Sequence, residues 1–61
     1  MNRYFKHLKT DIIYQLLYQA FECTNGRENK KYAVYVEADD TDHCDVFVRE
    51  WSEFNEKFKE V

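Results

Sequence analysis

An Asn-Gly pair, Asn25 and Gly26, lies between two apolar segments of the chain, residues 12–23 and 32–38. Asn and Gly readily adopt the positive φ angles that a tight hairpin turn requires. The polar residues that follow, as far as Lys31, are equally compatible with a longer hairpin loop of about four to six residues. The pair therefore favours a hairpin, with either a two-residue turn or a longer loop at its tip.

Two segments in the second half of the chain have the composition of β-strands. Residues 32–38 and residues 45–49 are rich in β-branched and aromatic side chains, which pack well on a pleated surface. Between them lies the polar run 39–43, which is dominated by aspartate and interrupts regular structure. The sequence predicts a second hairpin whose two strands are joined by an acidic loop.

The segment 11–23 fits two structures. Polar residues recur at helical spacing, at Asp11, Gln15, Gln19 and Glu22, and leave the other positions apolar. In an extended conformation the even positions from residue 12 to residue 20 form one apolar face instead. Periodicity slightly favours a helix and the Asn-Gly turn that follows favours a strand, so these residues alone leave both open.

The last segment, residues 50–60, carries Trp51, Phe54 and Phe58 at spacings of three and four. This spacing places the three rings on one side of a helix, with the charged residues between them facing water. The sequence predicts a short helical turn near residues 50–58.

The length of 61 residues predicts a single domain, residues 1–61, with one small core. Aromatic residues make up 18% of the chain and supply the large contact areas that a short chain needs for a core. Few apolar side chains are then left to build a buried active site. The sequence contains neither a phosphate-binding glycine loop nor an assembled nucleophile or acid–base set. We therefore expect the protein not to be an enzyme.

Several short motifs follow one another in an order that resembles the bacterial and phage domain of unknown function 1653. These motifs cover roughly residues 4–58 and are His7-Leu8-Lys9, Tyr14, Thr24-Asn25-Gly26, Val34-Tyr35, Val46-Phe47-Val48-Arg49 and Phe54. The chain departs from the family pattern at Thr10, where the family has glycine, and at Glu50, where it has proline. The second loop, residues 39–43, also differs.

The resemblance implies a mainly β fold, a small SH3-like barrel of about five strands. It implies that segment 11–23 is a long, bent strand rather than a helix. It implies no catalytic residues, because the family has no established activity. The occurrence of that family in phages implies an accessory or inhibitory protein of phage origin.

Candidate metal ligands lack the spacing of known metal sites. The adjacent pair His43 and Cys44 would point apart in a strand, whereas zinc sites use pairs separated by two or more residues. The acidic residues Asp40, Asp42 and Asp45 lack the glycine and the terminal glutamate of a calcium-binding loop. We expect neither a metal nor a cofactor.

The charge pattern offers one candidate binding surface. Five acidic residues fall within nine positions that contain no Lys or Arg: Glu37, Asp39, Asp40, Asp42 and Asp45. Such a loop is either a solvated turn or a surface that steers a partner with a basic patch. We take Asp39, Asp40 and Asp42 as candidate binding residues.

The aromatic residues offer a second candidate surface. Tyr is enriched where one end of a side chain is buried and the other is wet, which includes protein interfaces. The sequence predicts an exposed cluster formed by Tyr18, Tyr35 and Trp51 beside Arg49. In the alternative, the tyrosine hydroxyls simply reach the rim of the core, and Arg49 forms a structural ion pair with a nearby carboxylate.

These features together predict a non-catalytic module that binds another protein. The net charge of −3 argues against nucleic acid, although exposed aromatic residues could stack on bases. Open edge strands could instead pair between two copies and form a homodimer. The longest apolar stretch is too short to span a bilayer and the N-terminus lacks a signal-peptide pattern, so we expect a cytoplasmic protein.

Overall fold

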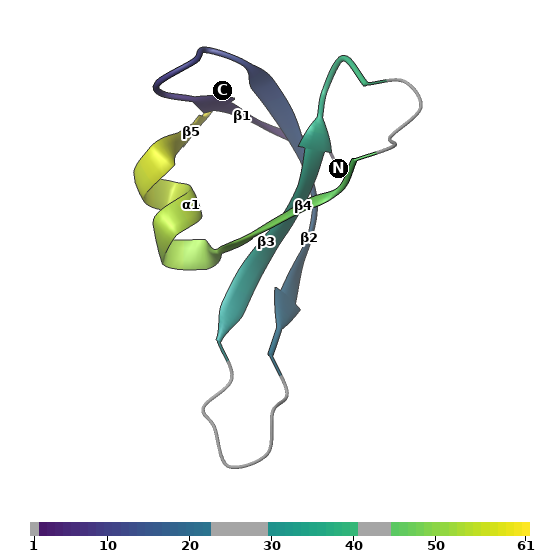
Figure 1. Ribbon diagram of the computed structural model, residues 1–61, viewed down its shortest axis with the longest axis vertical. Coiled ribbons are helices and arrows are strands. Elements are labelled where there is room, and N and C mark those ends of the chain that lie inside the picture. Colours follow the sequence, from purple (N-terminus) through teal and green to yellow (C-terminus); the bar gives the residue numbers. More distant parts are fainter. Residues whose placement is uncertain (1, 23–29, 41–44) are drawn as a thin grey trace.

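The computed structural model describes residues 2–22, 30–40 and 45–61, which form one antiparallel sheet and one short helix (Figure 1). The elements in chain order are β1 (Arg3–His7), β2 (Ile13–Phe21), β3 (Lys31–Glu37), β4 (Phe47–Glu50), α1 (Trp51–Lys57) and β5 (Phe58–Glu60). The prediction of a mainly β fold with about five strands and a short helical turn is confirmed.

The five strands lie in the order β4-β3-β2-β1-β5. The first four strands follow one another across the sheet, and α1 then carries the chain from the edge strand β4 to the opposite edge strand β5. In Figure 1 α1 lies on one side of the curved sheet, between β4 and β5. The sheet does not close on itself, so the expected barrel describes this architecture only loosely.

Within the segment 11–23, the strand β2 runs from Ile13 to Phe21, as the resemblance implied, whereas helical periodicity favoured a helix. β2 pairs with β1 on one side and with β3 on the other, so its backbone groups are satisfied along both edges. The register with β3 shifts between Leu16 and Tyr18. A bulge of this kind bends a strand and increases its twist, in agreement with the expected bent strand.

Both predicted hairpin pairings are present. β2 and β3 remain paired up to Phe21 and Lys31, and the backbone N–H of Glu22 donates to the carbonyl of Lys30 at 2.9 Å. The Asn25-Gly26 turn itself lies outside the described residues. β3 and β4 pair antiparallel across the acidic loop, of which residues 41–44 lie outside the described residues.

A tight turn joins β1 to β2. The N–H of Asp11 donates to the carbonyl of His7 at 2.8 Å, and the N–H of His7 donates to the carbonyl of Ile12 at 2.9 Å. Asp11 has a φ of 63°, in the left-handed region that Asp tolerates better than most residues. This turn brings residues 8–10 next to the end of α1, where the N–H of Leu8 donates to the carbonyl of Lys57 at 2.9 Å.

The core lies between α1 and the sheet and is almost entirely aromatic. Its buried members are Phe5, Ala33, Tyr35, Phe54 and Phe58. Phe54 stacks on Phe58 with ring centroids 4.4 Å apart, and meets Phe5 edge-on at 4.8 Å. A helix of seven residues is marginal by itself, so the burial of Phe54 is what holds α1 on the sheet.

The chain leaves the helix earlier than the spacing of its aromatic residues suggests. α1 ends at Lys57, and Phe58 begins β5, which pairs with β1 from His7 to Phe5. Phe58 is buried as the first residue of β5. An apolar residue at this position would also be buried at the end of a longer helix, so the apolar pattern alone does not distinguish helix from strand here.

Candidate functional site

The side of the sheet opposite α1 carries a row of apolar residues that no described helix covers. Tyr18, Val34 and Val48 are direct partners across β2, β3 and β4, so their side chains lie on the same face. We call this side the outer face. Tyr18 is 64% exposed and Val48 is 61% exposed, whereas Val34 between them is half-buried.

The outer face continues beside this row. Val36, two residues after Val34 on β3, is fully buried but does not belong to the core cluster beneath α1. Val46, which directly precedes β4, is also more than half exposed. Large exposed apolar side chains gathered on one face are typical of interaction surfaces.

Charged residues flank the outer face at the two ends of β3. Asp39 is exposed and Asp40 half-buried in the turn that follows β3, where the N–H of Asp40 donates to the carbonyl of Glu37 at 3.1 Å. Asp42 lies outside the described residues. At the other end of β3 the ammonium of Lys30 pairs with Glu50 at 3.8 Å. The two ends of β3 therefore differ in charge: carboxylates follow its last residue, whereas an ion pair lies beside its first residue.

The predicted cluster of Tyr18, Tyr35, Trp51 and Arg49 is not formed. Tyr35 is only 4% exposed and packs in the core, so its ring is not available to a partner. Trp51 is half-buried on the helix side of the sheet, stacked on Phe54 with centroids 5.8 Å apart. Tyr18 alone of the three predicted aromatic residues is well exposed, and it lies on the outer face.

Arg49 connects the core to α1. Its Nε donates to the hydroxyl of Tyr35 at 3.3 Å, and its Nη1 forms an ion pair with Glu53 in the first turn of α1. The hydrogen bond to Tyr35 is the main cause that raises the pKa of Arg49, and Glu53 adds to it. The prediction of a structural ion pair for Arg49 is confirmed.

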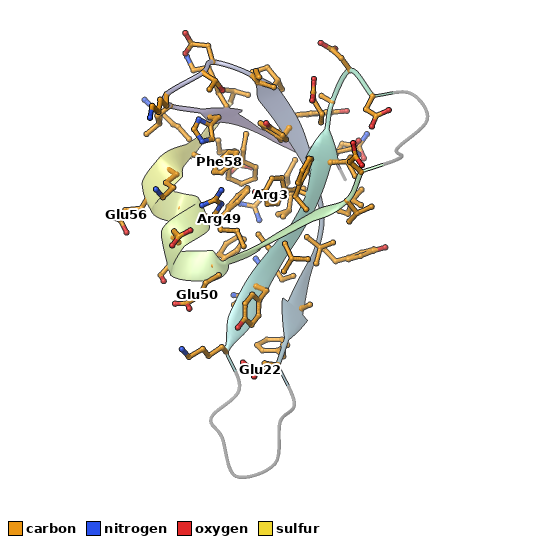
Figure 2. All side chains as sticks on the ribbon, in the orientation of Figure 1. Arg3, Glu22, Arg49, Glu50, Glu56 and Phe58 are labelled. Atoms are coloured by element: carbon orange, nitrogen blue, oxygen red, sulfur yellow. The ribbon has the colours of Figure 1, made fainter. Side chains whose placement is uncertain are left out.

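A cleft on the helix side of the sheet is lined by three positively charged side chains and one negatively charged one. Its volume is about 440 Å³ and its walls come from the β1–β2 turn, β4 and the end of α1. The lining residues are His7, Leu8, Lys9, Arg49, Glu56 and Lys57. Figure 2 shows Arg49 and Phe58 in the space between α1 and the sheet, while Glu56 points away from the sheet.

Sequence reasoning missed this cleft as a site. Four of its residues, the run His7-Leu8-Lys9 and Arg49, are among those that carry the family resemblance, but Arg49 follows Lys9 only after forty residues of chain. Lys57 and Glu56 were read as water-facing residues of the helical turn. The pairing of β1 with β5 brings the β1–β2 turn to the end of α1, and no local sequence pattern predicts that pairing.

No metal-binding cluster is present in residues 2–22, 30–40 and 45–61, since no three His, Cys, Asp or Glu side chains gather there. Cys23, His43 and Cys44 lie outside these ranges. The helix found in the described part of the chain is too short to cross a membrane.

The chain matches no family model, no curated protein and no solved structure. The resemblance to the domain of unknown function 1653 therefore stays a prediction.

Proposed function

We propose that this protein is a small non-catalytic module that binds another protein through the outer face of its sheet. The observation that supports the proposal is the row of Tyr18, Val34 and Val48, with two of its three side chains more than 60% exposed. A chain of this size needs nearly all its large apolar side chains for stability. Two that stay in water on one face are best explained by a partner that covers them.

The charges beside the outer face indicate the chemistry of that partner. Asp39, in the turn after β3, and Asp45, which precedes Val46 in the chain, are both exposed where the chain leaves β3 and returns to β4. A partner with an apolar patch bordered by Lys or Arg complements this arrangement. An accessory or inhibitory protein of phage origin, acting on a host protein, is the biological setting that the family resemblance adds.

A pull-down from bacterial lysate, with and without nuclease, tests this function. We expect one stoichiometric protein that is retained after nuclease treatment and is lost with the double substitution Tyr18→Ser and Val48→Thr. The control is Phe21→Ser, which removes an aromatic side chain of similar exposure from β2 at a position facing the other side of the sheet. Capture that depends on nucleic acid, or that withstands the double substitution, would overturn the proposal.

The contribution of the acidic turn is measured separately. Neutralising it with Asp39→Asn and Asp40→Asn should slow association with the captured partner at low salt and have little effect at high salt, where exposed charges are screened. An unchanged association rate at low salt would exclude steering by this turn.

Self-association is a second candidate function, favoured by the position of β4. This strand lies at the edge of the sheet and carries Val48 on the outer face. An edge strand has a row of backbone groups that can pair with a second chain. Sedimentation over a range of concentrations distinguishes the two functions, because a homodimer shows a concentration-dependent mass without any partner.

A further inference from the structure

We propose that the cleft between the β1–β2 turn and α1 binds the phosphate group of a small phosphomonoester. This site lies on the helix side of the sheet, so it is separate from the outer face and does not depend on the function proposed above. Three of its six lining residues, Lys9, Arg49 and Lys57, carry a positive charge, whereas the chain as a whole has a net charge of −3.

The two lysines of the cleft have no counter-ion among the residues that the structure describes. Neither Lys9 nor Lys57 forms an ion pair with any other described residue, although Lys6 and Lys30 both do. The negative charges at the cleft are Glu56, which is one of its lining residues, and Glu53, which is already paired with Arg49. Positive charge therefore remains in excess within the cleft.

The guanidinium of Arg49 is already ordered by contacts within the protein. Its Nε and Nη1 are fixed by Tyr35 and Glu53, and its guanidinium carbon lies 5.9 Å from the centre of the Phe58 ring. Nη2 has no hydrogen bond with the described residues, so its two N–H groups remain free to donate. An arginine that is already ordered loses little side-chain entropy when an anion binds.

His7 supplies a further donor. The backbone N–H of Lys9 donates to Nδ1 of His7 at 3.2 Å, which requires this nitrogen to be unprotonated. Nε2 is therefore the ring nitrogen that can donate a hydrogen bond. The ring is also held edge-on against Phe58, with centroids 4.8 Å apart. The hydrogen bond from Leu8 to the carbonyl of Lys57 removes one acceptor at the end of α1 that would repel an anion.

The number of donors and the size of the cleft indicate the ligand class. Ammonium, guanidinium and imidazole groups come from three different elements, and a tetrahedral phosphate accepts hydrogen bonds from several directions at once. A planar carboxylate is satisfied by one arginine fork. The volume of about 440 Å³ lies in the usual range for small-molecule sites, roughly 300–1,000 Å³, and Leu8 offers an apolar contact for the organic part.

An NMR titration of the ¹⁵N-labelled protein with ribose 5-phosphate tests the proposal. We expect saturable shift changes at residues 7–9, at residues 56 and 57 and at the Arg49 Nε–H group, and none of similar size with ribose or acetate. The substitutions Lys9→Gln and Lys57→Gln together should weaken binding by about tenfold or more, since each removes a charge-assisted hydrogen bond.

The matched control is Lys59→Gln, which removes the same charge from an exposed lysine of β5 outside the cleft. It should change the affinity by no more than about twofold, the effect of a distant exposed charge. Shifts that never saturate, equal effects of the cleft and control substitutions, or saturation by acetate would each overturn the proposal. Saturation by a phosphoserine peptide but not by ribose 5-phosphate would overturn the assignment to a small molecule.

Discussion

Replacing Phe54 by Ala removes the side chain that joins α1 to the sheet. Phe54 is 0% exposed and its ring meets those of Phe5, Tyr35, Trp51 and Phe58 at centroid distances of 4.4–5.8 Å. Truncation of a buried Phe to Ala costs about 3–5 kcal/mol. A domain of 61 residues has a total stability of roughly 3–9 kcal/mol, so we expect this substitution to cancel most of the free energy of unfolding.

Urea denaturation followed by circular dichroism measures this loss. The Phe54→Ala variant should show a folded baseline that is short or absent at room temperature. The control, Phe21→Ala, makes the same chemical change at a position that is 60% exposed, and it should cost no more than about 1 kcal/mol. A Phe54→Ala variant whose midpoint stays within the range of the Phe21→Ala variant would refute the conclusion that the aromatic core beneath α1 stabilises the fold.

Three further predictions concern polar contacts. The substitution Arg49→Met should lower the free energy of unfolding by about 1–2 kcal/mol. The loss should be smaller in a Tyr35→Phe background, because the hydrogen bond to the hydroxyl is then already missing. A double-mutant cycle by urea denaturation measures the difference. The hydrogen bond from Arg3 lowers the pKa of Glu60, so this pair stabilises the fold at neutral pH and its contribution disappears as the pH falls through the folded-state pKa; Glu60→Gln should therefore destabilise the protein at neutral pH but not in strong acid, as thermal melts across pH will show. Burial raises the pKa of Tyr14, so stability should decline as alkaline pH approaches that pKa, and Tyr14→Phe should reduce this decline in alkaline melts.

The class of fold could be predicted because several local signals agree. Strands β3 and β4 coincide with the segments rich in β-branched and aromatic residues, and the helical spacing of Trp51 and Phe54 matches α1. For β2 the local pattern was ambiguous, since Gln15 and Gln19 fit both periods. Its strand conformation results from pairing with β1 on one edge and β3 on the other. These hydrogen bonds join separate segments of the chain, so the residues of a single segment do not predict them.

The candidate surfaces were harder to predict than the strands. The alternation in residues 45–49 places Val46 and Val48 on one face and Phe47 on the other, but it does not say which face α1 covers. The prediction that Tyr35 is exposed was wrong. Its ring lies on the face of the sheet that α1 covers, and its hydroxyl accepts a hydrogen bond from Arg49 there. An amphipathic residue such as Tyr can satisfy both requirements inside a small core.

The pairing of β1 with β5 determines when the protein can fold. Arg3 and Glu60 form two hydrogen bonds although they are 57 residues apart in the chain. Bringing together such distant segments costs chain entropy before any contact compensates for it, which slows folding. During synthesis β1 leaves the ribosome long before β5, so one edge of the growing sheet and one side of its aromatic core remain open to water and to other chains. Completion of the fold therefore awaits the last residues of β5, and the ribosome-bound chain is the form of this protein most exposed to aggregation and to chaperones.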